Sequence, residues 1–370
     1  MTAISLLDIP PEIHLQIAKF VETRQTLKAL SVTSRSLRSV AQSILFESLQ
    51  IDLGTYLGLR GSVDNLLANP RICAAIRFLV LGRGRHLFSS APPPNNEEQL
   101  SLIQKRLPEM VGLRKVSILH VNLSKTFLDA FLGIAANMPL QIHLRGNIYP
   151  YGVIPMPHIP LQVSCLHFTL NDPPLEFYQS MLHASAATLT GLDILAEGDE
   201  LMELVDIDLP FLHDLTLSIT DRNEGSRTSA AAFITAQRAI RKLILTGSTL
   251  PLPPIPPNAL PNLRGLGASS EQVRQLVPGR PVEAIKVTFS RPCDQDWFGE
   301  ELGGSTSRVR MLRLNPLTTI LDTRMVKRMV TVLPSLERLW LPMFSDVSWP
   351  FRSITQTPAA HFPSDTPQCR

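Results

Sequence analysis

Charged residues and cysteines are both scarce in this chain of 370 residues. Charged side chains make up 18% of the chain and hydrophobic ones 44%. Because the usual charged share is about 25%, this composition excludes a wholly disordered chain and favours an extended core. No run of about 18 apolar residues occurs, so we expect no membrane span. The first apolar stretch contains Asp8 and Glu12 and has no basic leader, so we also expect no secretory signal.

The four cysteines, Cys73, Cys165, Cys293 and Cys369, lie far apart without paired spacing. This pattern fits neither a disulfide framework nor a zinc site, so we expect a reducing compartment, the cytoplasm and/or the nucleus. The net charge of +3 is too small to indicate a nucleic-acid-binding chain. We therefore expect no nucleic-acid partner and no membrane partner.

Two pairs of residues are the candidates for chemistry, and neither is complete. Cys165 and His167 lie two apart on a predicted strand and share a face, but a closed metal site needs a second pair of ligands. His213 and Asp214 are adjacent on a predicted strand, so they point to opposite faces, and no nucleophile accompanies them. The sequence thus predicts a protein that is not an enzyme and that holds no metal and no cofactor.

Residues 1–53 have apolar residues at helical spacing and predict three short helices. Proline and Glu12 suit the first turn of the first helix, which follows Ile9-Pro10-Pro11. The apolar positions of the three helices are Ile13, Ile17, Phe20 and Val21; Leu27 and Leu30; and, after Ser34 as the expected N-cap, Leu37, Val40, Ala41, Ile44 and Leu45. Because about 45 residues is near the lower limit for independent folding, we expect part of this apolar surface to contact a partner or the next domain.

This segment resembles an F-box. The resemblance rests on the leading Ile9-Pro10-Pro11-Glu12-Ile13, followed in order by Ile17, Leu27, Leu30, Ser34-Arg35 and the closing Ile44-Leu45-Phe46. It implies docking on the small Skp-type adaptor of a cullin-RING ubiquitin ligase, and through that adaptor on a cullin. The residues that the resemblance assigns to this contact are Ile9, Pro10, Ile13, Ile17, Leu27 and Leu30 at the buried centre, with Glu12 and Arg35 at the rim.

From residue 76 onward one pattern recurs: an apolar residue, two variable ones, an apolar residue, one variable one, and an apolar residue. The clear copies start at Leu113, Leu189, Leu212, Ile240, Val309 and Leu336, and the weaker ones at Ile76, Pro139, Val163, Leu263 and Val282. Successive starts lie between 19 residues apart (Leu263 to Val282) and 37 apart (Ile76 to Leu113). Most intervals fall within about 20–29 residues, which is typical of leucine-rich repeats.

Helical patterns lie between several of the repeated strands, following Ser124, Pro174 and Asp322. A strand-plus-helix repeat must stack on its neighbours to bury both of its apolar faces. We therefore predict an α/β fold in which a three-helix F-box, residues 1–53, precedes a curved leucine-rich-repeat-like solenoid, residues 54–350, with parallel strands on the concave face and helices outside. Residues 351–370 are expected to form a disordered tail. The whole is similar to fungal-type F-box proteins with divergent repeats.

Three connecting segments carry weaker expectations. The proline-rich stretch from Leu250 to Pro261 predicts an extended return segment. The polar stretch from Asp221 to Ser229 predicts a mobile loop. Gly265-Leu266-Gly267 lacks the further glycine or lysine of a phosphate-binding loop and is expected to form a turn.

The repeat pattern also predicts which side chains line the open strand face, because the apolar positions face the core. These side chains are Lys115, His143, Arg145, His167, Asp193, Asp214, Lys242, Lys286, Arg313, Arg338 and Trp340. Exposed tryptophan with arginine is typical of binding surfaces, so we predict that a protein substrate binds around Trp340, Arg313, Arg338 and Lys286. The alternatives are a solvated face without a ligand, and a Trp340 buried beneath the tail.

The resemblance implies a substrate receptor that positions an as yet unidentified protein substrate without itself transferring ubiquitin. A second hypothesis is a leucine-rich-repeat scaffold whose N-terminal helices only cap the solenoid, since solenoid ends need caps. The two hypotheses differ in the exposure of Ile13, Ile17 and Leu30. A docking face leaves these side chains partly accessible, whereas a cap buries them against the first repeat.

Overall fold

The structure is a computed structural model, and it describes residues 9–21, 23–33, 35–53, 67–82, 97–121, 123–145, 159–169, 175–196, 200–219, 224–289, 300–315 and 323–341. The expected N-cap Ser34 and the expected tail lie outside these ranges. The chain divides into two compact units, Met1–Val163 and Ser164–Arg370. The boundaries predicted at residues 53 and 350 stay predictions. In the described part, no helix has the length and apolarity needed to span a membrane.

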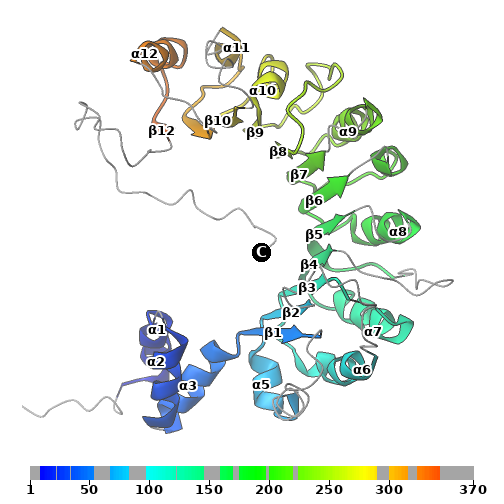
Figure 1. The fold of residues 1–370 in the computed structure, drawn as a ribbon, viewed down its shortest axis with the longest axis vertical. Helices are drawn as coiled ribbons and strands as arrows, with labels where there is room; N and C mark the ends of the chain where they lie inside the picture. The colour runs from blue at the N-terminus through cyan, green and yellow to red at the C-terminus, as the bar shows by residue number, and fades with distance from the viewer. Residues whose placement is uncertain are drawn as a thin grey trace, which may run out of the picture. The chain divides into compact units, whose positions relative to one another are not determined.

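The first unit begins with the three predicted helices, α1 (Pro11–Lys19), α2 (Arg24–Thr33) and α3 (Arg35–Leu45). Four parallel strands follow, paired in sequence order, with helices between them (Figure 1). These elements are β1 (Ser48–Asp52), α5 (Pro70–Ala75), β2 (Phe78–Gly82), α6 (Glu97–Arg106), η2 (Leu107–Glu109), β3 (Lys115–Leu119), α7 (Lys125–Ala135) and β4 (Leu140–Arg145).

The second unit continues the same plan, with parallel strands paired in sequence order. Within this unit the strands follow the inside of an arc and the helices lie outside it (Figure 1). Its elements are β5 (Val163–Thr169), α8 (Leu175–Ser185), β6 (Gly191–Ala196), η3 (Glu200–Leu204), β7 (Asp214–Ile219), α9 (Glu224–Ala236), β8 (Lys242–Thr246), β9 (Gly265–Ser269), α10 (Ser270–Leu276), β10 (Ala284–Thr288), α11 (Glu300–Gly303), β11 (Met311–Asn315), α12 (Thr323–Val332) and β12 (Arg338–Trp340).

Every predicted repeat forms a strand, and like positions of the repeat pair with one another. Leu192 of β6, for example, is opposite Leu215 of β7, which is opposite Leu243 of β8. Their side chains are at most 2% exposed, and the third apolar position is buried in the same way. Alternate strand residues point to opposite faces, so these buried positions face the core and the residues between them face the open side. The predicted α/β fold with parallel strands and helices is therefore confirmed.

The helices predicted between strands are also present as α7, α8 and α12. Ser124 begins α7 by accepting a hydrogen bond from the backbone N–H of Phe127. The buried face of this helix is Phe127, Leu128, Phe131, Leu132 and Ala135. Spacing of three and four residues places these side chains on one side, which is why the pattern identified the helix.

The loop predicted at Asp221 to Ser229 is wrong from Glu224 onward, because these residues form the first turns of α9. Serine has only moderate helix propensity, so the sequence reads as polar and irregular. Ser226 and Ser229 are nevertheless fully buried, and the Ser229 hydroxyl donates to the Ser226 carbonyl oxygen at 3.0 Å. Small side chains let α9 pack closely on its buried side, which continues with Phe233 and Ile234.

The turn predicted at Gly265-Leu266-Gly267 is also wrong, because these residues form β9. Leu266 is buried, and it pairs with Leu243 of β8 and Ile285 of β10. The repeat copy that starts at Leu263 is thus correct, and the two glycines occupy its variable positions on the open face.

The proline-rich segment from Leu250 to Pro261 connects β8 to β9 without a helix or a strand. Arg280 holds it in place: its guanidinium is buried, and it donates from Nε to Ala259 O (3.1 Å) and from Nη2 to Ile255 O (3.0 Å) and Pro256 O (2.8 Å). Nη1 donates to the carbonyl oxygens of Gln275 and Leu276 at the end of α10. All five N–H donors of the guanidinium thus have acceptors.

We predict that Arg280→Met lowers the free energy of unfolding by about 3 kcal/mol or more, because it leaves five carbonyl oxygens without their donor. Arg280→Lys should recover only part of the loss, since an ammonium has three donors. Urea unfolding followed by circular dichroism measures the effect. Arg264→Met is the control, because it removes only an exposed ion pair with Glu283 (3.6 Å) worth about 1 kcal/mol or less. Equal effects of Arg280→Met and Arg264→Met would contradict the role of Arg280.

Candidate functional site

Helix α1 turns its apolar stripe towards solvent. Its buried side chains are His14 and Ala18, each 2% exposed. The stripe predicted from the sequence lies on another side, with Ile13 48%, Ile17 47% and Phe20 85% exposed. Burying an isoleucine or phenylalanine side chain is worth roughly 1.5–3 kcal/mol, so an exposed stripe of this kind is a candidate contact surface.

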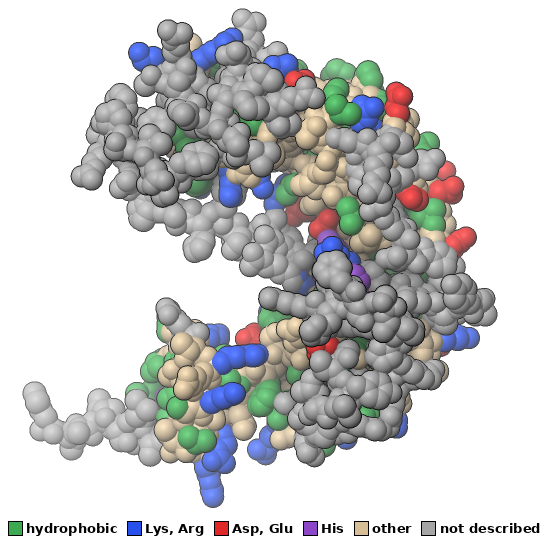
Figure 2. Space-filling view, in the orientation of Figure 1, with side chains coloured by type: hydrophobic (Ala, Val, Ile, Leu, Met, Phe, Trp, Pro, Cys, Tyr) green, Lys and Arg blue, Asp and Glu red, His purple; other side chains and the backbone are tan. Residues whose placement is uncertain are grey.

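The other residues assigned to the adaptor contact differ in exposure. Pro10, Glu12 and Arg35 are exposed, and Ile9 and Leu30 are half-buried. Leu27 is only 5% exposed, so it belongs to the interior of the helical segment together with Leu37 and Ala41 of α3. Figure 2 shows hydrophobic side chains interspersed with Lys and Arg on the surface of this segment.

The strand face of the second unit is a second candidate surface. In-register pairing aligns one row of side chains, Ile244, Gly267, Lys286, Arg313 and Trp340, on the consecutive strands β8 to β12. A parallel row two residues earlier contains Lys242, Gly265, Ala284, Met311 and Arg338. The four predicted substrate residues therefore lie on three neighbouring strands, with Lys286, Arg313 and Trp340 half-buried and Arg338 exposed.

The charges on this face change sign along the unit. Earlier strands have Asp193, which is hydrogen-bonded through Oδ2 to His167 Nδ1 (2.6 Å), and Asp214, and later strands have Lys242 and Lys286. In Figure 2, acidic and histidine side chains lie near Lys and Arg side chains on the strand side. A ligand along these strands would meet an acidic part and then a basic part.

The two lysines of the basic part titrate below the ordinary range of lysine. Burial lowers the pKa of Lys286, and the positive charges of Arg313 and Lys242 lower it further. Burial also lowers the pKa of Lys242, whereas Asp214 raises it. Lys286 is therefore the group of this basic part on which the charges of both Arg313 and Lys242 act.

Not every residue predicted on the open face is accessible. Lys115 of β3 is only 4% exposed, so the expectation that it lines an open surface is wrong. Lys115 lies two residues after Leu113 and is the first residue of β3. The sequence analysis placed Lys242 on the open face but did not include it in the predicted substrate site. The glycines of β9 were not expected on that face, although the repeat copy at Leu263 contains them.

The described residues contain no cluster of three or more metal-ligating side chains. Cys165 is 3% exposed and disulfide-bonded, so its thiol is not available as a ligand beside His167, and the expectation of unpaired cysteines is wrong for this residue. Cys73 is a free, fully buried thiol. Burial raises its pKa, and the charge of Glu109 raises it further, which disfavours the reactive thiolate.

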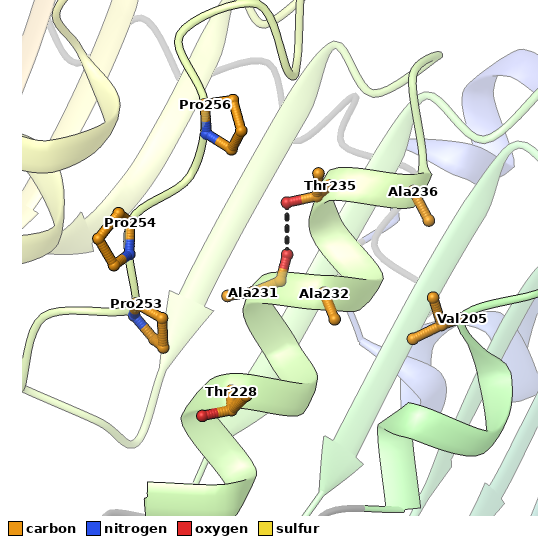
Figure 3. A pocket seen from close by; sticks show the side chains of 9 residues that line it. All are labelled: Val205, Thr228, Ala231, Ala232, Thr235, Ala236, Pro253, Pro254 and Pro256. Atoms are coloured by element: carbon orange, nitrogen blue, oxygen red, sulfur yellow. Dashed lines mark hydrogen bonds between the residues drawn. The ribbon is translucent and has the colours of Figure 1, made fainter.

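A shallow groove of about 470 Å³ lies between α9, the proline-rich segment and Val205 (Figure 3). Its lining side chains are those of Val205, Thr228, Ala231, Ala232, Thr235, Ala236, Pro253, Pro254 and Pro256. The Thr235 hydroxyl donates to the Ala231 carbonyl oxygen (2.7 Å), so it is satisfied within the helix. The groove offers methyl groups and proline rings but no charged side chain.

No family model and no curated protein matches this chain. A chain in the crystal structure of the Rad7 and Elc1 complex in yeast is similar in fold at a TM-score of 0.37 and 12% sequence identity, over 88% of this chain and 85% of that chain. At this level of similarity, function has to be argued from the surfaces described above.

We predict that Arg313→Gln raises the pKa of Lys286 towards the ordinary lysine range, because it removes one of the two repelling charges. The pKa of Lys242 should move much less, because Arg313 is not among the groups that shift it. Competitive acetylation across pH, read by mass spectrometry against a free lysine peptide, measures both values. An unchanged Lys286 value in Arg313→Gln would show that the two side chains do not interact.

Proposed function

We propose that this protein is a non-catalytic substrate-recognition subunit. Its N-terminal helices dock on a Skp-type adaptor, and through it on a cullin of a ubiquitin ligase, while its repeats bind a protein substrate. The proposed places of action are the cytoplasm and/or the nucleus. Such a subunit works by positioning, because holding a target lysine near a charged conjugating enzyme raises its effective concentration.

The observation that carries this proposal is the outward stripe of α1. Docking on a partner requires accessible apolar side chains at the centre of the contact, and Ile13 and Ile17 are each almost half exposed. A helix that only capped the solenoid would bury these side chains, yet α1 buries His14 and Ala18 instead. The same exposure therefore argues against the alternative of a scaffold with an N-terminal cap.

The absence of catalysis in this proposal rests on the chemistry of the cysteines. Ubiquitin transfer through a thioester needs an accessible thiolate. Among the described cysteines, Cys73 is fully buried and Cys165 is disulfide-bonded. The proposed role therefore assigns transfer to another subunit of the assembly.

We predict that Ile13→Asp or Ile17→Asp weakens binding of a Skp-type adaptor by more than about thirtyfold, because each change places a charge at the centre of an apolar contact. Binding of the full chain to purified adaptor, measured by calorimetry, tests this expectation. Both positions are exposed, so circular dichroism should show an unchanged fold.

Val330→Asp on α12 is the matched control, since Val330 is 58% exposed and lies in the other unit. It should leave adaptor binding unchanged. If the Ile13 and Ile17 variants bind like the original chain, or if no adaptor binds at all, the helices do not form a docking site. A loss of stability in the same variants would then favour the cap.

We predict that the triple change Trp340→Ala, Arg313→Glu and Arg338→Glu weakens capture of the substrate by more than about tenfold and spares adaptor binding. The change removes the aromatic side chain and reverses two charges on neighbouring strands. Partners are first identified by affinity capture with the original chain and then compared between variants. Arg308→Glu with Lys327→Glu is the control, because both side chains are exposed and lie outside the strands. Undiminished capture of every partner would exclude this surface.

A further inference from the structure

Helix α9 lies in a part of the second unit where the neighbouring connections have no α-helix. The connection before it, from β6 to β7, has only the short η3 in its described residues, and the connection after it, from β8 to β9, is the proline-rich segment. Elsewhere in this unit, α8 and α10 occupy the corresponding place (Figure 1). Because stacked repeats contact only their neighbours, no helix covers the two flanks of α9. Its outer side therefore becomes the floor of the groove in Figure 3.

The floor of this groove consists of small side chains. Along α9 it extends from Thr228 to Ala236, eight residues or about 12 Å of helix. Ala232 and Ala236 lie on the side of α9 nearer Val205, and Thr235 lies on the side nearer the prolines (Figure 3). Small side chains let a second helix approach to an interaxial distance of about 8 Å. The groove thus has the length and the depth for about two turns of a helix.

The proline wall of the groove favours a helix over an extended peptide. Proline has no N–H, and the carbonyl oxygens of Pro253 and Pro256 already accept from Gln275 Nε2 (2.9 Å) and Arg280 Nη2 (2.8 Å). The Thr235 hydroxyl is satisfied within α9. An extended peptide would gain no backbone hydrogen bonds from these groups, whereas a helix satisfies its backbone internally.

Acidic side chains lie beside the groove. Glu203 and Asp206 are on either side of the lining residue Val205 in the chain. Glu224 lies one helical turn before Thr228, whose hydroxyl donates to the Glu224 carbonyl oxygen (3.1 Å). All three acidic side chains are exposed. Figure 2 shows acidic side chains beside hydrophobic ones on the helix side of this unit.

The cations of this region lie elsewhere. Arg227 of α9 is held at the proline wall, where its Nη1 donates to Pro251 O (3.1 Å). Beyond that wall, Arg274 of α10 contacts Glu271 (3.4 Å). Arg238 is exposed and follows the C-terminal end of α9. A ligand with its cations towards η3 is therefore complementary to the groove.

We propose that this groove binds a basic amphipathic helix of a partner protein. The apolar side chains of that helix pack against the small residues of α9 and the proline rings, and its lysines or arginines lie along η3, near Glu203 and Asp206. The groove is on the helix side of the second unit, so this contact is separate from the strand face and from the N-terminal helices (Figure 1). It goes beyond the receptor role, because it adds a partner that is neither the adaptor nor the substrate.

The test measures binding of the full chain to a fluorescein-labelled peptide of leucine, alanine and lysine. The peptide has about 18 residues, enough to form a helix, and its leucines recur three and four residues apart. One matched peptide alternates leucine and lysine, which removes the helical apolar face, and another has glutamate in place of lysine. At about physiological salt, we expect the first peptide to bind at least about tenfold more tightly than each of the others. Raised salt should weaken this binding without abolishing it, because apolar contacts remain.

Ala236→Lys tests the floor of the groove. The position is exposed and lysine has good helix propensity, so circular dichroism should show an unchanged fold. A lysine here narrows the groove and repels a basic ligand, so it should weaken peptide binding at least about tenfold. Thr331→Lys on α12 adds the same charge at another exposed helical position and should change nothing.

Glu203→Gln combined with Asp206→Asn tests the acidic side. It should weaken peptide binding about threefold or more, as expected for the loss of two exposed ion pairs. Glu47→Gln combined with Asp129→Asn is the matched control, because it makes the same two changes at exposed positions of the first unit. This control should leave binding unchanged.

Each other outcome overturns the proposal. Equal binding of the alternating peptide would show that the groove does not select a helix, and equal binding of the glutamate peptide would show that the acids have no role. Binding that survives either groove variant would place the site elsewhere, and absent binding would remove it. A change in sedimentation of Ala236→Lys without peptide would show that a second copy of this chain occupies the groove. Because no adaptor and no substrate are present, failure here is distinct from failure of the receptor role.

Discussion

The alternation of side chains along short parallel strands, combined with pairing of like positions, is the constraint on which the repeat region depends. It sends Leu192 and its equivalents into the core and the residues between them to the open face. Slippage of one strand by one residue would exchange the two sets, and burial of the leucines opposes this. The same register aligns Lys286, Arg313 and Trp340 on consecutive strands. The candidate surface is therefore a direct product of the packing that stabilises the fold.

The connection from β8 to β9 shows how a segment without regular structure is kept in this arrangement. Its prolines cannot form a helix, so its carbonyl oxygens need donors from elsewhere. Arg280 supplies three of these donors, to Ile255 O, Pro256 O and Ala259 O. The Gln275 side chain supplies two more, to Leu252 O and Pro253 O. These bonds fasten the segment to α10, which directly follows β9. The segment that leads into β9 is thus held by a buried cation on the helix side of the same repeat.

Much of this architecture could be predicted from the sequence, and the failures have physical reasons. Leucines at fixed spacing identified every strand after residue 76, and apolar residues three and four apart identified α7. Helix α9 was missed because its buried face begins with serines, whose burial depends on neighbours that the local sequence does not reveal. The glycines of β9 resembled a turn because glycine has a low strand propensity. Strand propensity depends on context, and pairing with β8 on one side and β10 on the other keeps this segment in the sheet. The spacing of apolar residues identified the stripe on α1, but it could not reveal that the stripe faces solvent. That orientation depends on how α1 packs against α3.

The two candidate surfaces use different physics, and this difference bears on how they could work together. The stripe of Ile13, Ile17 and Phe20 offers apolar area, whose burial gives affinity that depends little on salt. The cluster on β8 to β11 offers charge, which gives selectivity and fast association and weakens as salt rises. An apolar contact suits a constant partner, whereas a charged contact can be switched by modification of the ligand. A subunit with one surface of each kind can stay bound to its assembly while it exchanges the molecules it presents.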